Sequence, residues 1–246
     1  MIYVTVFIIG TILGSFYNVV GYRIPKGESI IFPSSHCPKC NHKLKFYELI
    51  PILSYIIQKG KCKKCQKKIP IFYPIFELIT GLLFALTYKV FGLTPQYILA
   101  ITFISMLIII TISDLLYMII PDSVLIFFTS IIIIEKIIIY GLNQGLTAII
   151  NGLVAFLLML TLKKLGDILF KKESMGGGDI KLMFTIGMTL NYQQAILSVF
   201  AGSIIGLPIS IIMLKNKKEH IIPFGPLISI GAIIILLGQI NISNLL

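Results

Sequence analysis

Eight apolar segments separated by short polar stretches constrain this sequence more than any other feature. They lie near residues 1–20, 72–91, 96–114, 122–140, 146–162, 180–190, 194–214 and 221–240. Most of them reach the roughly 17–25 residues that a helix needs to cross the hydrocarbon of a bilayer. The segment 180–190 is shorter and rises only ~16 Å as a helix. We therefore predict an all-α membrane protein, a polytopic helical bundle of about eight transmembrane segments.

The composition supports a membrane protein. Hydrophobic residues make up 57% of the chain and charged residues only 13%, which is about half the share usual in soluble domains. A soluble globule of 246 residues has too little interior to bury this much apolar surface. The first segment has no basic region at its start and no small-residue cleavage site before Arg23, so we interpret it as a membrane span rather than a signal peptide.

The net charge of +11 is concentrated in three stretches between apolar segments. A nucleic-acid-binding protein is the other class that such a charge indicates, but no RNA- or DNA-binding motif accompanies it. The basic residues lie in loops 21–71, 163–181 and 215–220: Arg23, Lys26, Lys39, Lys43, Lys45, Lys59, Lys61, Lys63, Lys64, Lys67, Lys68, Lys163, Lys164, Lys171, Lys172, Lys181, Lys215, Lys217 and Lys218. Eight spans place these loops on one face and leave Lys89 and Lys136 near the other. The bias predicts that the three loops face the cytoplasm, that both termini lie outside, and that anionic lipid meets the basic face.

Four cysteines in the first basic loop form two pairs, Cys37 with Cys40 and Cys62 with Cys65. Two such CxxC knuckles match the spacing of a tetrahedral Zn²⁺ site with four thiolate ligands, and neighbouring lysines favour the thiolate form. A reducing cytoplasm opposes disulfides. A complete four-cysteine shell leaves no position for a substrate, so the predicted zinc is structural. Redox-active CxxC pairs and free thiols are the alternatives, and we interpret His36 and His42 as surface residues rather than ligands.

We divide the chain into a first transmembrane helix (1–20), a cytoplasmic cysteine-bearing loop domain (21–71) and a membrane-embedded domain (72–246).

Few acidic residues lie inside or beside the apolar segments: Glu77, Asp114, Asp122, Glu135 and Asp179. Asp114 ends the third segment and Asp179 opens the sixth, so the predicted orientation puts both at the cytoplasmic end of a helix. Two close carboxylates do not both ionise, so one activates water as a general base while the other donates a proton to a scissile carbonyl. Gly176, Gly177 and Gly178, which precede Asp179, would let the backbone bend and approach an extended peptide.

These carboxylates also have simpler interpretations. Asp122, after Pro121, is suited to capping a helix, as is Asp179 with its glycines forming a loop. A phosphate-binding loop lacks the P-loop or Rossmann spacing. Glu77 could be a charge at a helix start, and Glu135 a partner of Lys136. From the residues alone, an aspartyl dyad and a transporter or proton-relay site remain equal alternatives.

Nine motifs follow one another along the whole chain. They are Gly14-Ser15-Phe16-Tyr17-Asn18-Val19-Val20, Arg23-Ile24-Pro25, Ser35-His36-Cys37-Pro38-Lys39-Cys40, Glu48-Leu49-Ile50-Pro51, Gly60-Lys61-Cys62-Lys63-Lys64-Cys65, Tyr73-Pro74-Ile75-Phe76-Glu77, Asp114-Leu115 with Ile120-Pro121-Asp122, Gly176-Gly177-Gly178-Asp179-Ile180-Lys181 and Pro223-Phe224-Gly225-Pro226. In this order they resemble the type IV prepilin peptidase family, and the cysteine loop resembles its bacterial branch.

The resemblance implies a membrane aspartyl protease of the GxGD type. Its catalytic aspartates map onto Asp114 and Asp179, and its motif glycines onto Gly176 and Gly178, while Asp122 matches the pattern without being catalytic. We assign Gly177, Lys181 and Glu77 with these glycines to substrate positioning. The implied substrates are prepilins or pseudopilins, which carry a basic leader, a glycine before the cleaved bond and then an apolar helix.

Many bacterial members of this family also methylate the new amino terminus with S-adenosylmethionine, an activity that here rests on the resemblance alone. The basic leader and the basic cytoplasmic face do not complement each other, so we expect the apolar helix of the substrate to dock among the spans. A proton-coupled transporter with a zinc-stabilised loop is the alternative function, although the half-chains show no internal pseudo-symmetry.

Overall fold

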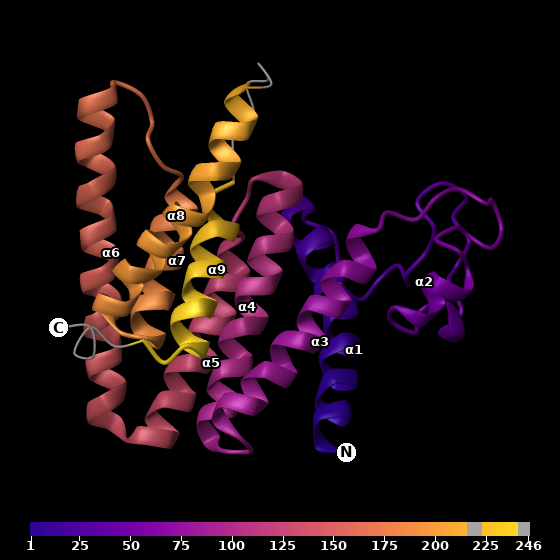
Figure 1. Ribbon diagram of the computed structural model, residues 1–246, viewed down its shortest axis with the longest axis horizontal. Helices are drawn as coiled ribbons and strands as arrows, with labels where there is room; N and C mark the ends of the chain where they lie inside the picture. Colours follow the sequence, from indigo (N-terminus) through magenta and orange to yellow (C-terminus); the bar gives the residue numbers. More distant parts are fainter. Residues whose placement is uncertain (216–222, 241–246) are drawn as a thin grey trace. The chain divides into compact units, whose positions relative to one another are not determined.

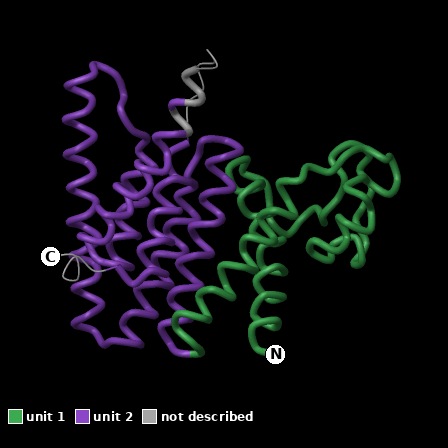
Figure 2. The backbone as a smooth tube through the Cα atoms, in the orientation of Figure 1, with its two compact units in different colours: residues 1–93 green, residues 94–246 purple. Residues whose placement is uncertain are grey.

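The computed structural model describes residues 1–215 and 223–240, and the chain forms two compact units, residues 1–93 and 94–246 (Figures 1 and 2). The first unit extends past the boundary predicted at residue 72, because the helix that begins there packs along the first helix of the chain. The functional division into 1–20, 21–71 and 72–246 stays a prediction.

Each predicted apolar segment corresponds to one helix. The eight helices are α1 (Ile2–Arg23), α3 (Phe72–Phe91), α4 (Pro95–Tyr117), α5 (Asp122–Tyr140), α6 (Leu142–Phe170), α7 (Gly177–Thr189), α8 (Tyr192–Lys215) and α9 (Gly225–Leu237). Within residues 1–215 and 223–240 there is no strand, so the predicted all-α fold is confirmed.

The count of eight transmembrane spans is not confirmed. Among the described residues, five helices are long and apolar enough to cross a membrane: α1 and α3 to α6. Helices α7 and α9 have 13 residues each and rise ~20 Å, short of the ~30 Å of hydrocarbon.

The loop predicted over residues 163–181 is much shorter in the structure. Helix α6 continues to Phe170 and ends at Lys171, whose φ of 50° is left-handed. Residues 163–170 contain no proline and several straight-chain residues, which lose little freedom in a helix, so they extend it. Lys163 and Lys164 therefore lie on α6, and Lys181 lies on α7. Lys217 and Lys218 fall outside the described residues.

In the first unit, α1 and α3 pack closely through glycines. A methyl group added to Gly10 would lie 2.8 Å from the Gly81 Cα, and one added to Gly14 would lie 2.8 Å from the Thr80 Oγ1. Small residues let helices approach in membranes, where packing and hydrogen bonds drive association. Between these helices the chain forms two short 3₁₀ helices (Ile24–Lys26 and Phe46–Glu48) and a short α-helix, α2 (Leu53–Ile57).

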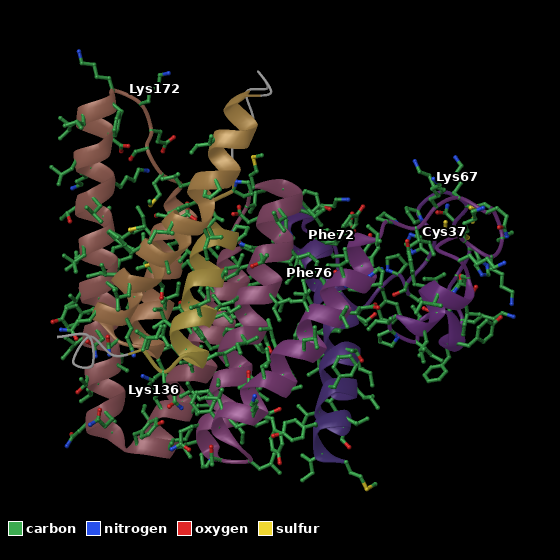
Figure 3. The ribbon with its side chains drawn as sticks, in the orientation of Figure 1. Cys37, Lys67, Phe72, Phe76, Lys136 and Lys172 are labelled. Carbon is green, nitrogen blue, oxygen red and sulfur yellow. The ribbon has the colours of Figure 1, made fainter. Side chains whose placement is uncertain are left out.

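In the second unit, most residues of α4, α7 and α9 are buried. Fourteen of the 23 residues of α4 and nine of the 13 residues of α7 are buried. Helix α7 contacts α5, α6, α8 and α9, so these neighbours shield the short helix from lipid. Figure 3 shows Lys172 and Lys136 at opposite ends of this unit; the placement of these lysines on opposite faces of a membrane stays a prediction.

Enlarging Gly10 should destabilise the first unit. We expect Gly10→Leu to lower stability by ~1–3 kcal/mol, because the added side chain meets the backbone of Gly81, which cannot rotate away. Thermal unfolding of the protein in detergent measures this loss. Ile9→Leu is the matched control, since the Ile9 side chain is 49% exposed. An unchanged unfolding temperature for Gly10→Leu would show that the two helices do not depend on this contact.

Candidate active site and metal site

Asp114 lies in the last turn of α4 and is buried. Its Oδ2 accepts a hydrogen bond of 3.1 Å from the backbone N–H of Gly225, the first residue of α9. The first N–H groups of a helix have no partner within the helix and form its positive end. The start of α9 therefore supplies a hydrogen-bond donor and a favourable electrostatic field to this buried carboxylate.

Asp179 is the third residue of α7 and is also buried. Gly176 is the N-cap, in extended conformation, and Gly177 and Gly178 are the first two helical residues. The flexible glycine turn predicted before Asp179 is therefore wrong, and so is the interpretation of Asp179 as the N-cap. An acidic residue in the first turn is stabilised by the positive end of the helix, which favours helix formation through these glycines. The backbone amide of Gly176 also stabilises the Asp179 carboxylate.

Ile120 separates the starts of α7 and α9. A methyl group on Gly178 would lie 2.9 Å from Ile120 Cβ, and one on Gly225 would lie 3.2 Å from Ile120 Cδ1 and 2.7 Å from Asp114 Oδ2. The turn that holds Ile120 is fixed by a 2.6 Å hydrogen bond from Ser113 Oγ to the Ile119 carbonyl. Both helix starts thus need glycine to pack against one side chain.

This packing brings the two carboxylates together. The charge of Asp114 acts directly on Asp179, so the pair expected from their shared depth lies within electrostatic range in the structure. Gly176 and Gly177 are exposed, and a side chain at Gly177 would meet nothing within 4 Å. The dyad is therefore buried on its helix side while the backbone before it is open to an approaching molecule. Such a pair can act as a general base and a general acid on one bond.

Lys181 forms an ion pair with Asp122, its Nζ donating to Oδ1 at 2.8 Å and to Oδ2 at 2.7 Å. The predicted capping role of Asp122 is wrong, because Pro121 is the N-cap of α5 and the Asp122 side chain reaches α7 instead. The two side chains are 53% and 57% exposed, so the pair contributes little to stability. Its geometric effect is to tie the start of α5 to the helix turn that follows Asp179.

A cavity of about 450 Å³ extends from this ion pair between α5, α6 and α7. Leu125, Leu153 and Phe156 contribute to its mostly apolar wall. Thr129 and Thr185, also in the wall, hydrogen-bond to each other at 2.7 Å between their Oγ1 atoms. The cavity has room for apolar side chains, and one end of it lies two residues beyond Asp179.

The remaining carboxylates of the apolar segments have structural partners. Glu77 belongs to the first unit, is buried, and accepts a 2.7 Å hydrogen bond from the Ile52 N–H of the cysteine-bearing loop. Glu135 accepts a 2.8 Å hydrogen bond from Thr102 Oγ1 on α4, so the interpretation of Lys136 as its partner is wrong.

The four cysteines form one compact cluster in the first unit. Their Sγ atoms all lie within 4.8 Å of one another, with 3.9 Å between Cys37 and Cys65 and 3.8 Å between Cys40 and Cys62. A tetrahedral site with Zn–S bonds of ~2.3 Å requires sulfurs about 3.8 Å apart, so the cluster fits zinc. Neither histidine belongs to the described cluster: His42 pairs with Glu48, and His36 Nδ1 lies 2.9 Å from the Ser34 carbonyl.

Two equivalent backbone turns build this cluster. The Cys37 N–H donates to the His42 carbonyl and the Cys62 N–H to the Lys67 carbonyl, both at 2.9 Å. Backbone N–H groups, first that of Lys39, lower the pKa of the Cys37 thiol to about 7. The His42 N–H favours ionisation of Cys40 as well, but burial and the neighbouring thiols raise its pKa to about 11. A divalent cation bound here would hold its cysteine ligands as thiolates.

Sequence reasoning did not select Gly225 and Ile120, which position the dyad. Both lie within the family motifs of the sequence, but neither has a side chain that ionises or binds metal. Their residue types therefore did not indicate a role in the site. Their role depends on contacts between residues 111 positions apart in the chain.

Comparison with known proteins gives two family matches and many similar chains. Residues 8–91 match the bacterial peptidase A24 N-terminal domain, and residues 101–211 match the type IV leader peptidase family. The prepilin leader peptidase/N-methyltransferase of Bacillus subtilis (strain 168) is 37% identical over 93% of this chain and 91% of its own length. That of Neisseria gonorrhoeae is 31% identical over 93% of this chain and 87% of its own. No solved structure matches. With two adjoining family matches and this identity over nearly the whole length, the chain belongs to the type IV leader peptidase family.

Proposed function

We propose that this chain removes the leader from prepilins or pseudopilins, using Asp114 and Asp179 as a water-activating dyad. The observation that carries the proposal is the pairing of two buried carboxylates, each at the positive end of a helix. Membership of the leader peptidase family and the names of its relatives support the reaction. A transporter receives no support from either.

The dyad would cleave the peptide bond in two steps. The ionised carboxylate takes a proton from water, whose oxygen attacks the scissile carbonyl, while the protonated carboxyl donates its proton to the carbonyl oxygen. The carbon–nitrogen bond then breaks, the leaving amine receives the proton taken from water, and one hydroxyl of the diol returns its proton to the other carboxylate as the new carboxylic acid forms. Because the two groups end the cycle with one proton between them, the dyad is restored.

The open backbone beside Asp179 suits a substrate with glycine before the cleaved bond. Gly176 and Gly177 project no side chain and are exposed, so an extended peptide can come close to the carboxylates there. The cavity between α5, α6 and α7 starts at Lys181 and would take apolar side chains from the helix that follows the bond. Lys181 and Asp122 would mark the end of this groove, so we assign Lys181 to substrate positioning.

We place the protein in the cytoplasmic membrane with its dyad facing the cytoplasm. The basic residues in and around the loop 171–176, which precedes Asp179, support this orientation. A basic leader gains no attraction from a basic face, so apolar contacts with the helix would supply most of the affinity.

We propose that Zn²⁺ is bound by Cys37, Cys40, Cys62 and Cys65 and stabilises the loop without taking part in cleavage. We also propose, from the names of the relatives, that the new amino terminus is methylated. S-adenosylmethionine would supply the methyl group, and we assign no residues to it.

Removing either carboxylate should abolish cleavage. We expect Asp114→Asn and Asp179→Asn each to lower the rate by at least ~10²-fold, because an amide cannot transfer the proton. The assay follows the size shift of a membrane substrate with a basic leader, Gly-Phe and an apolar helix. Glu135→Gln is the matched control, since an amide oxygen can still accept the hydrogen bond from Thr102. Full processing by either Asp variant would rule out the dyad.

Filling the groove should weaken substrate binding. Ser130 lines the cavity on α5, so Ser130→Trp should raise KM several-fold and leave kcat nearly unchanged. Ile138→Trp is the control, because Ile138 lies on the same helix, is 77% exposed and does not line the cavity. Equal KM values for the two variants would place the apolar helix of the substrate elsewhere.

Elemental analysis of the purified protein should find one zinc ion per chain. We expect Cys37→Ser and Cys62→Ser to lose the metal and to make the loop sensitive to protease, because each removes one of four ligands. His36→Ala should retain the zinc. A reversible thiol–disulfide couple in metal-free wild-type protein would instead favour a redox role for the two pairs.

A further inference from the structure

The cysteine-bearing loop contains an apolar stretch, residues 46–57, that interrupts its basic sequence. It has no lysine or arginine, follows Lys45 directly, and is separated from Lys59 by Gln58 alone. Seven of its side chains are large, apolar and exposed: Phe46, Tyr47, Leu49, Ile50, Leu53, Ile56 and Ile57. Phe46 is 87% exposed and Ile57 77%. Apolar groups gathered in this way mark a surface that meets something other than water.

A hydrogen bond fixes the depth of this stretch relative to α3. The Ile52 N–H, at the N-cap of α2, donates to Glu77 Oε2 at 2.7 Å. Glu77 lies five residues beyond the start of α3, which corresponds to ~7.5 Å along the helix axis. Since the 20 residues of α3 rise ~30 Å, they match the hydrocarbon thickness of a bilayer. Helix α2 therefore begins below the level at which α3 enters the membrane.

The backbone at this point is strained, which shows that the anchor is specific. Ile52 has a φ of 61° and a ψ of −53°, a conformation that a β-branched residue rarely adopts. The turn persists because surrounding groups hold it, and the buried Glu77 carboxylate is one of them.

The view of the first unit agrees with this depth. Figure 3 shows Lys67 on the far side of Phe72 from the body of α3, and Figure 1 shows α2 at the level of the upper part of α3 in the same orientation. Lys67 and α2 thus lie on different sides of the loop in this view, while Lys63 of the second knuckle lies over the Tyr47 ring of the apolar stretch, 5.0 Å from its centroid.

We propose that residues 46–57 insert into the headgroup and upper acyl region of an anionic bilayer, while Lys45 and Lys59 contact the lipid phosphates. Interfacial segments bury their apolar face ~5–10 Å into this boundary, which includes the depth set by Glu77. Lysines bounding such a segment extend their charged ends to the headgroups and gain from anionic lipid. The zinc-fitting cluster would then sit on the membrane surface, with α2 as its point of attachment.

A lipid partner accounts for the surface better than a protein partner does. The stretch is continuous in depth with a membrane-spanning helix of its own unit, so lipid is already present there. Its single acidic residue, Glu48, is buried and accepts hydrogen bonds from the Lys45 N–H and from His42, leaving no exposed negative charge to repel phosphate.

The absence of tryptophan from the chain allows a direct test. We would reconstitute Phe46→Trp, Ile57→Trp and Lys67→Trp, each with its zinc content checked, into phosphatidylglycerol vesicles containing phosphatidylcholine brominated high on its acyl chains. We expect the first two to lose most of their fluorescence to the bromines and Lys67→Trp to keep nearly all of it. Two probes are used because one of the substitutions could disturb the loop, in which case the other still reports the depth of the stretch.

Two outcomes would overturn the proposal. One is fluorescence of Phe46→Trp and Ile57→Trp as insensitive to brominated lipid as that of Lys67→Trp. The other is tryptophan fluorescence of these two variants in brominated vesicles that changes only on adding prepilin substrate or on raising the protein concentration. A change with substrate would assign the surface to the substrate, and a change with protein concentration would assign it to a second copy of the chain. Adding Lys45→Gln and Lys59→Gln to the Ile57→Trp protein should reduce quenching in anionic vesicles but not in neutral ones.

Discussion

The arrangement of the second unit depends on how two buried carboxylates, Asp114 and Asp179, are stabilised where little water reaches them. Asp114 meets the free N–H at the start of α9, and Asp179 lies in the first turn of α7. Helix starts are suited to this task because their N–H groups are unpaired and carry partial positive charge. The two carboxylates can lie close together only if α7 and α9 begin beside the end of α4. This requirement sets the positions of the two short helices.

Glycine makes this convergence possible by taking up no space. Gly178 and Gly225 both press against Ile120, and any side chain at either position would push the helix starts apart. Gly177 and Gly178 are helical, so the bend expected at these two glycines is absent, and Gly178 is needed for close packing against Ile120. A side chain at Gly177 would meet nothing within 4 Å, so the backbone stays open at this position.

The sequence was sufficient to predict most of the helices but not how they meet. Apolar length and charge located eight helices, and the shared depth of Asp114 and Asp179 predicted their pairing. The CxxC spacing predicted the cysteine cluster. By contrast, the Asp122–Lys181 ion pair, the Glu135–Thr102 hydrogen bond and the Gly225 donor join distant segments, and no local pattern encodes them. The end of α6 and the start of α7 were also predicted wrongly. Polar residues extend α6, and the glycines at the start of α7 are helical because Asp179 in the first turn is stabilised by the positive end of the helix.

Glu77 illustrates how the same chemical group serves a different purpose in the first unit. A buried carboxyl beside a membrane helix suggests a site of reaction by default. Here its oxygen accepts the N–H of a strained turn, and Asn18 Nδ2 donates to the Tyr73 carbonyl one turn earlier on α3. Polar side chains at this end of α1 and α3 thus fix backbone groups. Asp114 in the second unit likewise accepts a backbone N–H, from Gly225 at 3.1 Å, so the hydrogen bond alone does not distinguish the two carboxylates. Their surroundings do: Asp114 acts electrostatically on a second carboxylate, Asp179, which lies next to exposed glycine backbone, whereas Glu77 meets a strained loop turn.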